Sequence, residues 1–330
     1  MSGWHPYVVD LTGDAAAAAL ALAGDAAREY GTVESPDLQA EALTIAQELP
    51  RDVRRALNAF RLSEPSCVCL VRGLPVDDAA LGPTPRTRAE RERGGQTAAE
   101  VFFYLCAALL GDPIAWSTKH SGRIMHTIAP LPEDEDEQLA SSSTTPLTWH
   151  TEDAFHPLRA DYVALLCLRN PDGVPTTVGC VDNLTLPPRV REVLSQPRFT
   201  ITPDGSQLAS GGMAAMAANP EPVPLLFGAQ DAPYLRLDQF YTRPLDSDAE
   251  ARSALDSLLA ATDASLSRYA LRPGEVCIVD NYRAVHGRDS FRARYDGTDR
   301  WLRRLNIARD LRRSRALRAA PAVRVLGTSA

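Results

Sequence analysis

The sequence lacks the short motifs of several common enzyme and metal-binding classes. It has no CxxC pair, no HExxH motif, no Walker phosphate loop, no GxGxxG motif and no internal repeat. These absences argue against zinc ribbons, HExxH hydrolases, and P-loop or dinucleotide-binding proteins. The six cysteines lie mostly in apolar runs and match no metal-site spacing, so we expect buried thiols in a reducing compartment.

Long hydrophobic runs and an excess of positive charge are also missing. The apolar run at 15–22 is too short to cross a bilayer, and the first residues carry no basic cluster. With 35 Lys and Arg against 42 Asp and Glu, the net charge is −7. We therefore expect a cytoplasmic protein that binds neither membranes nor nucleic acid. Its oligomeric state cannot be inferred from the sequence.

The chain of 330 residues is rich in turn formers, with 25 prolines and 20 glycines, which favours short elements. We expect helices at 14–28, 36–49, 52–62, 96–110 and 248–269, and hence a helical N-terminal part over 1–63. The expected strands are 67–72, 114–117, 123–128, 147–150, 162–168, 176–181, 199–201, 224–227, 234–237, 275–279 and 301–308. Residues 203–222 have the composition of a lid loop, and 310–330 form a basic tail.

The segment Trp-His150-Thr-Glu152 carries the most informative pattern. On an extended segment, side chains two residues apart share a face, so an imidazole and a carboxylate can bind one metal. A second histidine would complete a 2-His-1-carboxylate triad, the ligand set of non-haem Fe(II) oxygenases. Alone, the His-x-Glu pattern is common and weak. We interpret His156, four residues further on, and His126 as structural histidines.

A second region supplies the missing partners. His286 lies at the end of a turn that follows the apolar strand expected at 275–279. Arg300 opens the last strand, 14 residues further on. A guanidinium near a metal can hold the far carboxylate of a chelating dicarboxylate such as 2-oxoglutarate. Because His150 and His286 must meet at one metal, we expect residues 1–330 to form a single domain.

Together these segments resemble the clavaminate synthase-like branch of the Fe(II)/2-oxoglutarate-dependent dioxygenases, whose nearest members are hydroxylases of arginine, asparagine or lysine. The resemblance extends from about residue 63 to 308. It rests on SEPS at 63–66, SSS at 141–143, HTEDAFHP at 150–157, RADY at 159–162, LRNPDG at 168–173, DN at 280–281 continuing to HGR at 286–288, and RWLRR at 300–304. It implies a mainly β fold, with a distorted jelly-roll (double-stranded β-helix) core flanked by helices.

The resemblance also implies roles for individual residues. Fe(II) would be held by His150, Glu152 and His286. The co-substrate 2-oxoglutarate would be gripped by Arg300 and supported by Thr177, with Thr176 the weaker candidate, and O₂ would be the oxidant.

Substrate contacts are implied as well. Arg304 would receive the substrate α-carboxylate, and Asp238, Glu152 and Ser142 would also contact the substrate. Arginine hydroxylases carry a second acid two residues after Asp238, where this chain has Phe240. That departure leaves guanidinium recognition open.

The expected activity is hydroxylation of C3 or C4 of a free basic or urea-bearing L-amino acid, namely lysine, arginine or citrulline, in specialised metabolism such as antibiotic biosynthesis. No catalytic residue beyond the metal ligands is expected. Desaturation of the same substrates and hydroxylation of a carrier-bound amino acid or a peptide use the same residues. Two rivals come from other classes: a non-catalytic jelly-roll that binds or senses a ligand, and a zinc hydrolase.

Overall fold

Two β-sheets form the centre of the protein. The computed structural model describes residues 5–92, 94, 96–203 and 213–327. The larger sheet holds, in spatial order, β1 (Tyr7–Asp10), β2 (Val68–Arg72), β13 (Val276–Asp280), β6 (Tyr162–Arg169), β15 (Trp301–Ala308), β3 (Asp112–Trp116) and β16 (Val325–Leu326), with β4 (His126–Ile128) also on β15. The smaller sheet holds β12 (Ser267–Tyr269), β7 (Thr176–Cys180), β14 (Ala284–Arg288) and β5 (Leu147–His150).

Both faces of the larger sheet are buried. Successive side chains along a strand point to opposite faces, so alternate residues of one strand belong to different apolar clusters. In β13, Val276 and Ile278 join the apolar cluster under the helices, whereas Cys277 and Val279 join the cluster between the sheets. Val178 of β7, in the smaller sheet, belongs to the same inner cluster. The two sheets therefore pack face to face, which confirms the expected mainly β class with a jelly-roll core.

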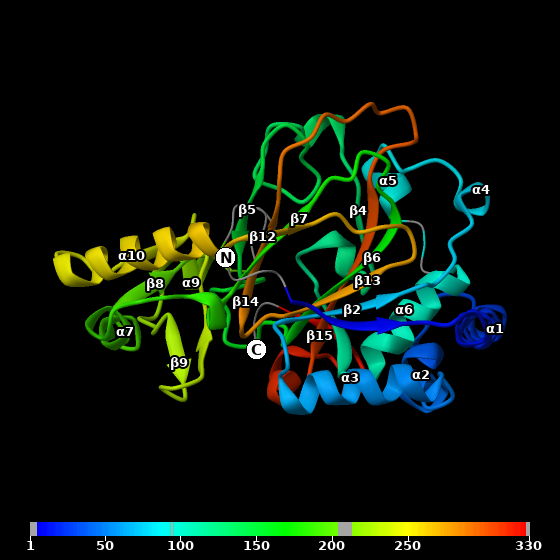
Figure 1. Cartoon of the computed structure of the whole chain (residues 1–330), viewed down its shortest axis with the longest axis horizontal. Coiled ribbons are helices and arrows are strands. Elements are labelled where there is room, and N and C mark those ends of the chain that lie inside the picture. The colour runs from blue at the N-terminus through cyan, green and yellow to red at the C-terminus, as the bar shows by residue number, and fades with distance from the viewer. Residues whose placement is uncertain (1–4, 93, 95, 204–212, 328–330) are drawn as a thin grey trace.

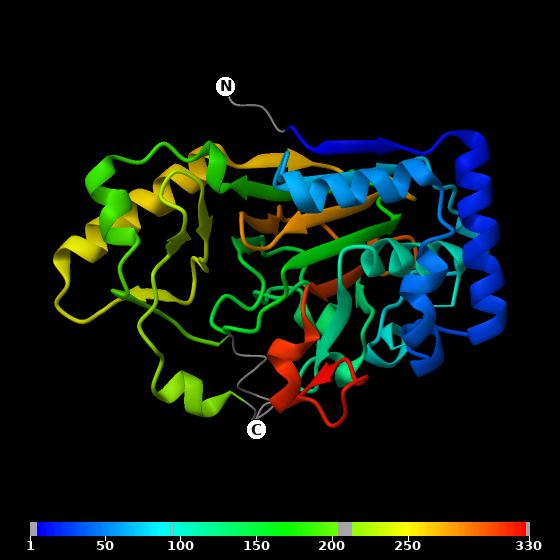
Figure 2. The ribbon, with the colours of Figure 1, turned by 90° about the horizontal axis from the view of Figure 1, so that it is seen from below.

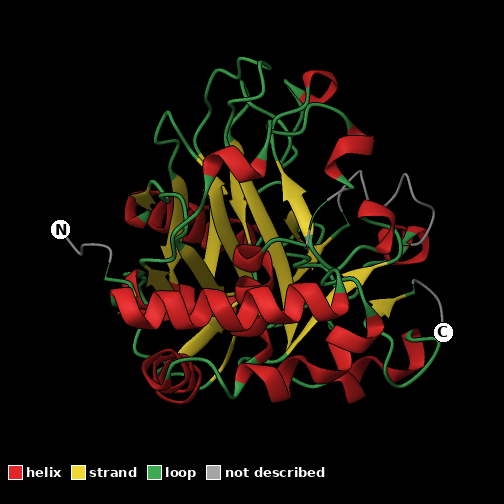
Figure 3. Cartoon of the chain, turned by 90° about the vertical axis from the view of Figure 1, so that its right-hand side faces the viewer, coloured by secondary structure: helices red, strands yellow, loops and turns green. Residues whose placement is uncertain are grey.

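Helices cover the outside of this core. The outer face of the larger sheet packs against α1 (Gly13–Tyr30), α2 (Pro36–Ala46), α3 (Arg51–Ser63) and α6 (Ala98–Ala108). On the opposite side of the molecule lie α7 (Pro188–Leu194) and α10 (Ala249–Ser265), as Figures 1 and 2 show. Figure 3 shows helices in front of the strands, viewed from the side of α1. The helices therefore cover the outer face of the larger sheet, while its inner face packs on the smaller sheet.

The remaining elements are short. Two strand pairs lie near α7 and α10, namely β8 (Phe199–Ile201) with β11 (Thr242–Pro244) and β9 (Leu226–Gly228) with β10 (Pro233–Leu235). Three short helices are α4 (Asp78–Leu81), α5 (Arg88–Arg91) and α9 (Ala214–Ala218). Single 3₁₀ segments occur at His120–Gly122, Pro132–Asp134, Val181–Asn183 and Leu311–Leu317.

Three expectations about elements were wrong. The N-terminal part is not purely helical, because Tyr7–Asp10 forms β1 and pairs in parallel with β2. The helix expected at 248–269 ends at Ser265, and Ser267–Tyr269 forms β12 against β7. His286 does not lie at the end of a turn but inside β14, between β5 and β7. The short β1 and β12 carry no clear alternation, and β14 contains a glycine, so the sequence pattern is weak in all three.

The structure describes only parts of the expected lid and of the expected basic tail. Of the expected lid at 203–222, residues 204–212 lie outside the described part, and Ala214–Ala218 forms α9. Within the expected basic tail, 328–330 lie outside the described part, while Arg318 is buried and bonds the carbonyls of Leu311 and Val323. That the chain is one domain stays a prediction. Across the described residues, no helix has the length and apolar character needed to cross a membrane.

The cluster between the sheets provides a test of the fold. Leu70 of β2 is fully buried there, whereas Leu43 of α2 is 54% exposed. We expect Leu70→Ala to lower the free energy of unfolding by about 2–5 kcal/mol, because it removes buried apolar contacts and leaves a cavity. Leu43→Ala, the matched control, should change it by less than about 0.5 kcal/mol. Chemical denaturation of both variants measures this; equal effects would contradict the layering.

Candidate active site

Two neighbouring strands bring three metal-ligand side chains together. His150 ends β5, and it lies directly opposite His286 in the antiparallel pair of β5 and β14. Glu152 follows in the turn after β5 rather than on the strand. Its backbone is held by the Asn281 amide, which accepts from Glu152 N at 2.8 Å and donates to the carbonyls of Glu152 and Ala160 at 3.1 and 2.8 Å. The turn thereby returns the carboxylate to the two histidines.

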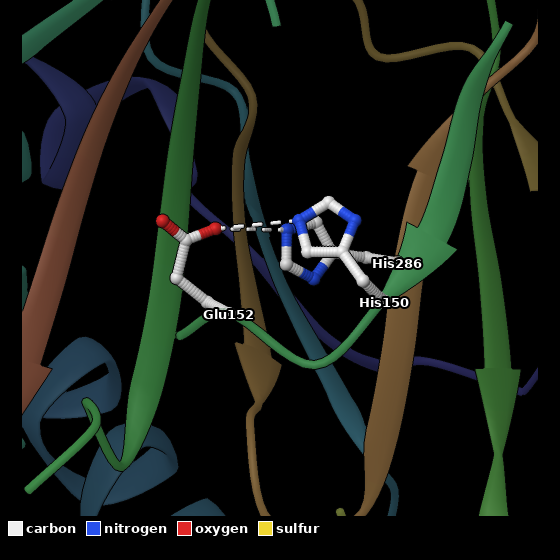
Figure 4. Close-up of side chains that lie close together, drawn as sticks. All are labelled: His150, Glu152 and His286. Atoms are coloured by element: carbon white, nitrogen blue, oxygen red, sulfur yellow. Dashed lines mark ion pairs between the residues drawn. The ribbon is translucent and has the colours of Figure 1, made fainter. Parts of the chain in front are cut away.

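The three side chains converge on one point, as Figure 4 shows. Glu152 Oε2 lies 3.5 Å from His150 Nε2 and 3.8 Å from His286 Nε2, and one ligand atom from each residue fits within 4.8 Å of the others. His150 Nδ1 donates to the Thr148 carbonyl at 2.9 Å, which leaves the Nε2 lone pair for a metal. Two imidazoles and one carboxylate in this arrangement fit a single Fe(II) with open positions.

The electrostatics of Glu152 and His286 suit the ligand role. Burial alone would raise the pKa of Glu152, but Arg304 and His150 outweigh it and hold that pKa well below its usual value. Arg304 Nη1 lies 3.1 Å from Glu152 Oε1. Burial, together with the charge of His150, lowers the pKa of His286 to about 3, so this imidazole is neutral at neutral pH. Metal ligands must be an ionised carboxylate and neutral imidazoles, which are the forms favoured at Glu152 and His286.

The expected co-substrate arginine is buried close to β7. Arg300 Nη2 lies 3.5 Å from the hydroxyl of Thr176, and Arg300 Nε has no partner among the described residues. Thr176 shares a face of β7 with Val178 of the inner cluster. Thr177 points to the other face, where its hydroxyl comes within 2.9 Å of the place that a Cβ on Gly287 would occupy. The structure thus brings Thr176 rather than Thr177 to Arg300.

A cavity of about 580 Å³ opens beside the metal ligands. His150, Glu152 and Arg304 line its inner part, and Asp238 and Phe240 also line it. Asp238 pairs through its backbone with His150 and accepts hydrogen bonds from the backbone of the residues after it. The cavity therefore places Arg304 and Asp238, among other charged residues, on the same lining as two of the metal ligands, His150 and Glu152.

Ser142 is not among the residues that line this cavity. Its hydroxyl and its carbonyl accept hydrogen bonds from Arg288 at 2.8 and 2.7 Å, and the hydroxyl also contacts the Thr145 carbonyl at 3.2 Å. The neighbouring Ser141 lines the cavity instead. The structure thus turns Ser142 toward Arg288, and Ser141 faces the cavity in its place.

Two cavity residues were missed by sequence reasoning as functional candidates. The rings of His120 and His126 stack with centroids 4.1 Å apart, and both line the cavity. His126 lies opposite Arg304 in the pair of β4 and β15, and Arg304 Nη2 donates to its Nδ1 at 3.1 Å. Burial lowers the pKa of His126 well below its usual value and that of His120 to about 3. The alternation in the strand at 123–128 could have placed His126 on the inner face.

Comparisons with known proteins agree with this site. A family model described as taurine catabolism dioxygenase TauD, TfdA family, matches residues 224–306. An enduracididine beta-hydroxylase of Streptomyces hygroscopicus is 47% identical over 96% of this chain and 98% of its own length. An L-ornithine/L-arginine 3-hydroxylase of Catenulispora acidiphila is 40% identical over 92% of this chain and 95% of its own.

Solved structures extend the comparison to ligands. The non-haem iron oxygenase OrfP, in complex with Fe, succinate and (3S)-hydroxy-L-Arg, superposes with a TM-score of 0.93 and 40% identity, covering 97% of this chain and 99% of that one. Another OrfP structure holds Fe and alpha-ketoglutaric acid. The expected use of iron and 2-oxoglutarate is thereby confirmed. The chain belongs to the TauD/TfdA family of Fe(II)/2-oxoglutarate-dependent oxygenases, in the branch that contains amino-acid hydroxylases.

Proposed function

We propose that this enzyme hydroxylates C3 of a free basic L-amino acid, with L-arginine as the first candidate. The observation that carries the proposal is that Arg304 and Asp238 line the same cavity as the metal ligands His150 and Glu152. A zwitterion with a cationic side chain needs a cation for its α-carboxylate and an anion for its far end. The two relatives described above are a beta-hydroxylase and a 3-hydroxylase, and both terms refer to C3.

The proposal also assigns the residues that hold the iron and the co-substrate. His150, Glu152 and His286 hold Fe(II), and Arg300 with Thr176 holds the distal carboxylate of 2-oxoglutarate. Thr177 is the less favoured threonine, because it lies on the other face of β7. Bound iron and 2-oxoglutarate activate O₂ and supply the oxidising power, while the protein positions the target carbon.

Arg304 orients the substrate. It extends from β15 into the cavity, where Nη1 pairs with Glu152 and Nη2 with His126. Those contacts immobilise the guanidinium before the substrate arrives, which lowers the entropic cost of binding an α-carboxylate. Because Arg304 also contacts a metal ligand, the amino acid is held with its first side-chain carbons close to the iron.

Asp238 and Phe240 suit the far end of the substrate. The Phe240 ring lines the cavity and is 51% exposed, so its face is accessible to a ligand. A guanidinium can pair with one carboxylate and stack on an aromatic face at the same time. Guanidinium recognition therefore does not require the second acid that arginine hydroxylases carry at the position of Phe240.

A substrate panel tests the reaction. The protein should be incubated with Fe(II), 2-oxoglutarate and each of the twenty amino acids, citrulline and ornithine, and the products followed by mass spectrometry. We expect L-arginine or a close basic relative to gain one oxygen atom, located at C3 by fragmentation, with formation of succinate. A product that has lost two hydrogens would indicate desaturation. No product from any of them would contradict a free amino-acid substrate.

Replacement of a metal ligand tests the iron site. We expect His286→Ala to lower 2-oxoglutarate-dependent succinate formation by more than about 100-fold, because even outer-shell partners of a metal are worth roughly 10–100-fold. A chelator should abolish wild-type activity, and added Fe(II) should restore it. The control is His156→Gln, a buried histidine outside the cavity lining that should keep most activity. Full turnover by His286→Ala would remove the iron assignment.

The role of Asp238 is tested by substrate discrimination. Asp238→Asn keeps the oxygen that accepts from the backbone of Phe240 and Tyr241 but removes the charge. We expect the ratio of kcat/KM for arginine over citrulline, its neutral analogue, to fall about tenfold or more, since a bond to a charged group contributes about 1.5–3 kcal/mol. The exposed Asp231→Asn should leave the ratio unchanged. An unchanged ratio in Asp238→Asn would exclude Asp238 as the side-chain selector.

A further inference from the structure

Arg288 lies on the same strand as a metal ligand. It ends β14, two residues after His286, so both side chains point to the same face. The register with β7 is regular, with His286 opposite Val178 and Arg288 opposite Thr176, while the pairing with β5 shifts between these two residues. Both partners share the inner face of β7. Arg288 is thus directed into the space between the sheets, beside the threonine that Arg300 contacts.

Arg288 is buried without an anionic partner. Its side chain is 4% exposed, and it donates to the Ser142 carbonyl at 2.7 Å and to the Ser142 hydroxyl and the Thr145 carbonyl at 2.8 Å. All three acceptors are neutral. Its Nε has no partner among the described residues, and the Phe291 ring lies 5.0 Å from its guanidinium carbon. The positive charge is therefore hydrogen-bonded but not neutralised.

Arg300 also lacks an anionic partner among the described residues. It is also buried, and its one hydrogen bond to a described residue goes to the neutral hydroxyl of Thr176. Thr176 is thus contacted by the Arg300 guanidinium and is the backbone partner of Arg288, and neither arginine makes an ion pair with any described residue. Burying a charge without a counter-charge is unfavourable. This part of the protein therefore attracts an anion more strongly than one arginine would.

We propose that Arg288 is a second cation of the 2-oxoglutarate site and that it acts with Arg300, across Thr176, on the distal carboxylate. The proposal rests on the iron and 2-oxoglutarate sites proposed above, and not on the identity of the amino acid. Residues two apart on a strand lie about 7 Å apart, which matches the reach of a five-carbon dicarboxylate held at the metal by its keto-acid end. β14 thereby supplies both a ligand for iron and a charge for the far end of the co-substrate.

A different role would explain the same contacts. Through Ser142 and Thr145, Arg288 could act solely as a clamp for the segment that places Leu139, Ala140 and Ser141 on the substrate cavity. The two roles differ in what they require. A clamp needs the fork of donors, whereas a second cation needs only the charge.

The test measures co-substrate binding without turnover or amino acid. The protein is loaded with Mn(II), and titration calorimetry measures its affinity for 2-oxoglutarate and for 2-oxobutyrate, which has the same keto-acid end but no distal carboxylate. We expect Arg288→Gln to weaken 2-oxoglutarate about tenfold or more and 2-oxobutyrate by less than about threefold. Arg288→Lys, which keeps the charge, should bind 2-oxoglutarate within about threefold of wild type.

Two further variants keep the test decisive. Ser142→Ala removes one acceptor of the Arg288 guanidinium but leaves the Arg288 charge. This variant should therefore bind 2-oxoglutarate with wild-type affinity, and it can be measured even if Arg288→Gln does not fold. Arg283→Gln is the control, because Arg283 is also buried beside β14 but pairs with Asp182. Unchanged 2-oxoglutarate binding in folded Arg288→Gln, equal weakening of both keto acids, or weakening in Arg288→Lys and Ser142→Ala would overturn the proposal. A wild-type protein that does not bind 2-oxoglutarate would instead refute the co-substrate site itself.

Discussion

The antiparallel pairing of β14 with β5 and β7 is the constraint on which the rest of the site depends. It places His286 directly opposite His150, although 136 residues separate them in the sequence (286 − 150), and it places Arg288 opposite Thr176. A shift of the register by one residue would turn every side chain of β14 to the other face. The two histidines and Arg288 are therefore positioned by one set of backbone hydrogen bonds, and Glu152 is added by the Asn281 amide.

The charge of the site opposes the charge of the chain. The protein has a net charge of −7, yet Arg288, Arg300 and Arg304 are all buried, and Glu152 is the acid in contact with Arg304. Buried cations are tolerated when an anion joins them. The site is consequently built to be completed by its ligands, which are a dicarboxylate and the carboxylate of an amino acid.

The sequence was a better guide to the chemistry of the site than to the direction in which individual side chains point. His150, Glu152 and His286 were identifiable because their residue types and the HTEDAFHP block are specific, and the strand at 301–308 was located correctly. The sequence favoured Thr177 over Thr176, whereas the structure brings Thr176 to Arg300, because adjacent strand residues face opposite sides and the pleat is set by pairing partners. The contact between Ser142 and Arg288 joins residues 146 positions apart, and no local pattern encodes it.

Specificity and reactivity are separated within one cavity. The iron end is built from strands whose register is set by long-range pairing. The far end is formed by Asp238 and Phe240, where the chain leaves β10 and turns toward β11, and the ring of Phe240 is half exposed. A substitution at such a position alters the shape and charge offered to the substrate at little cost in stability. The difference between this chain and hydroxylases with two acids at this place is therefore expected to alter substrate choice while leaving the oxidative chemistry unchanged.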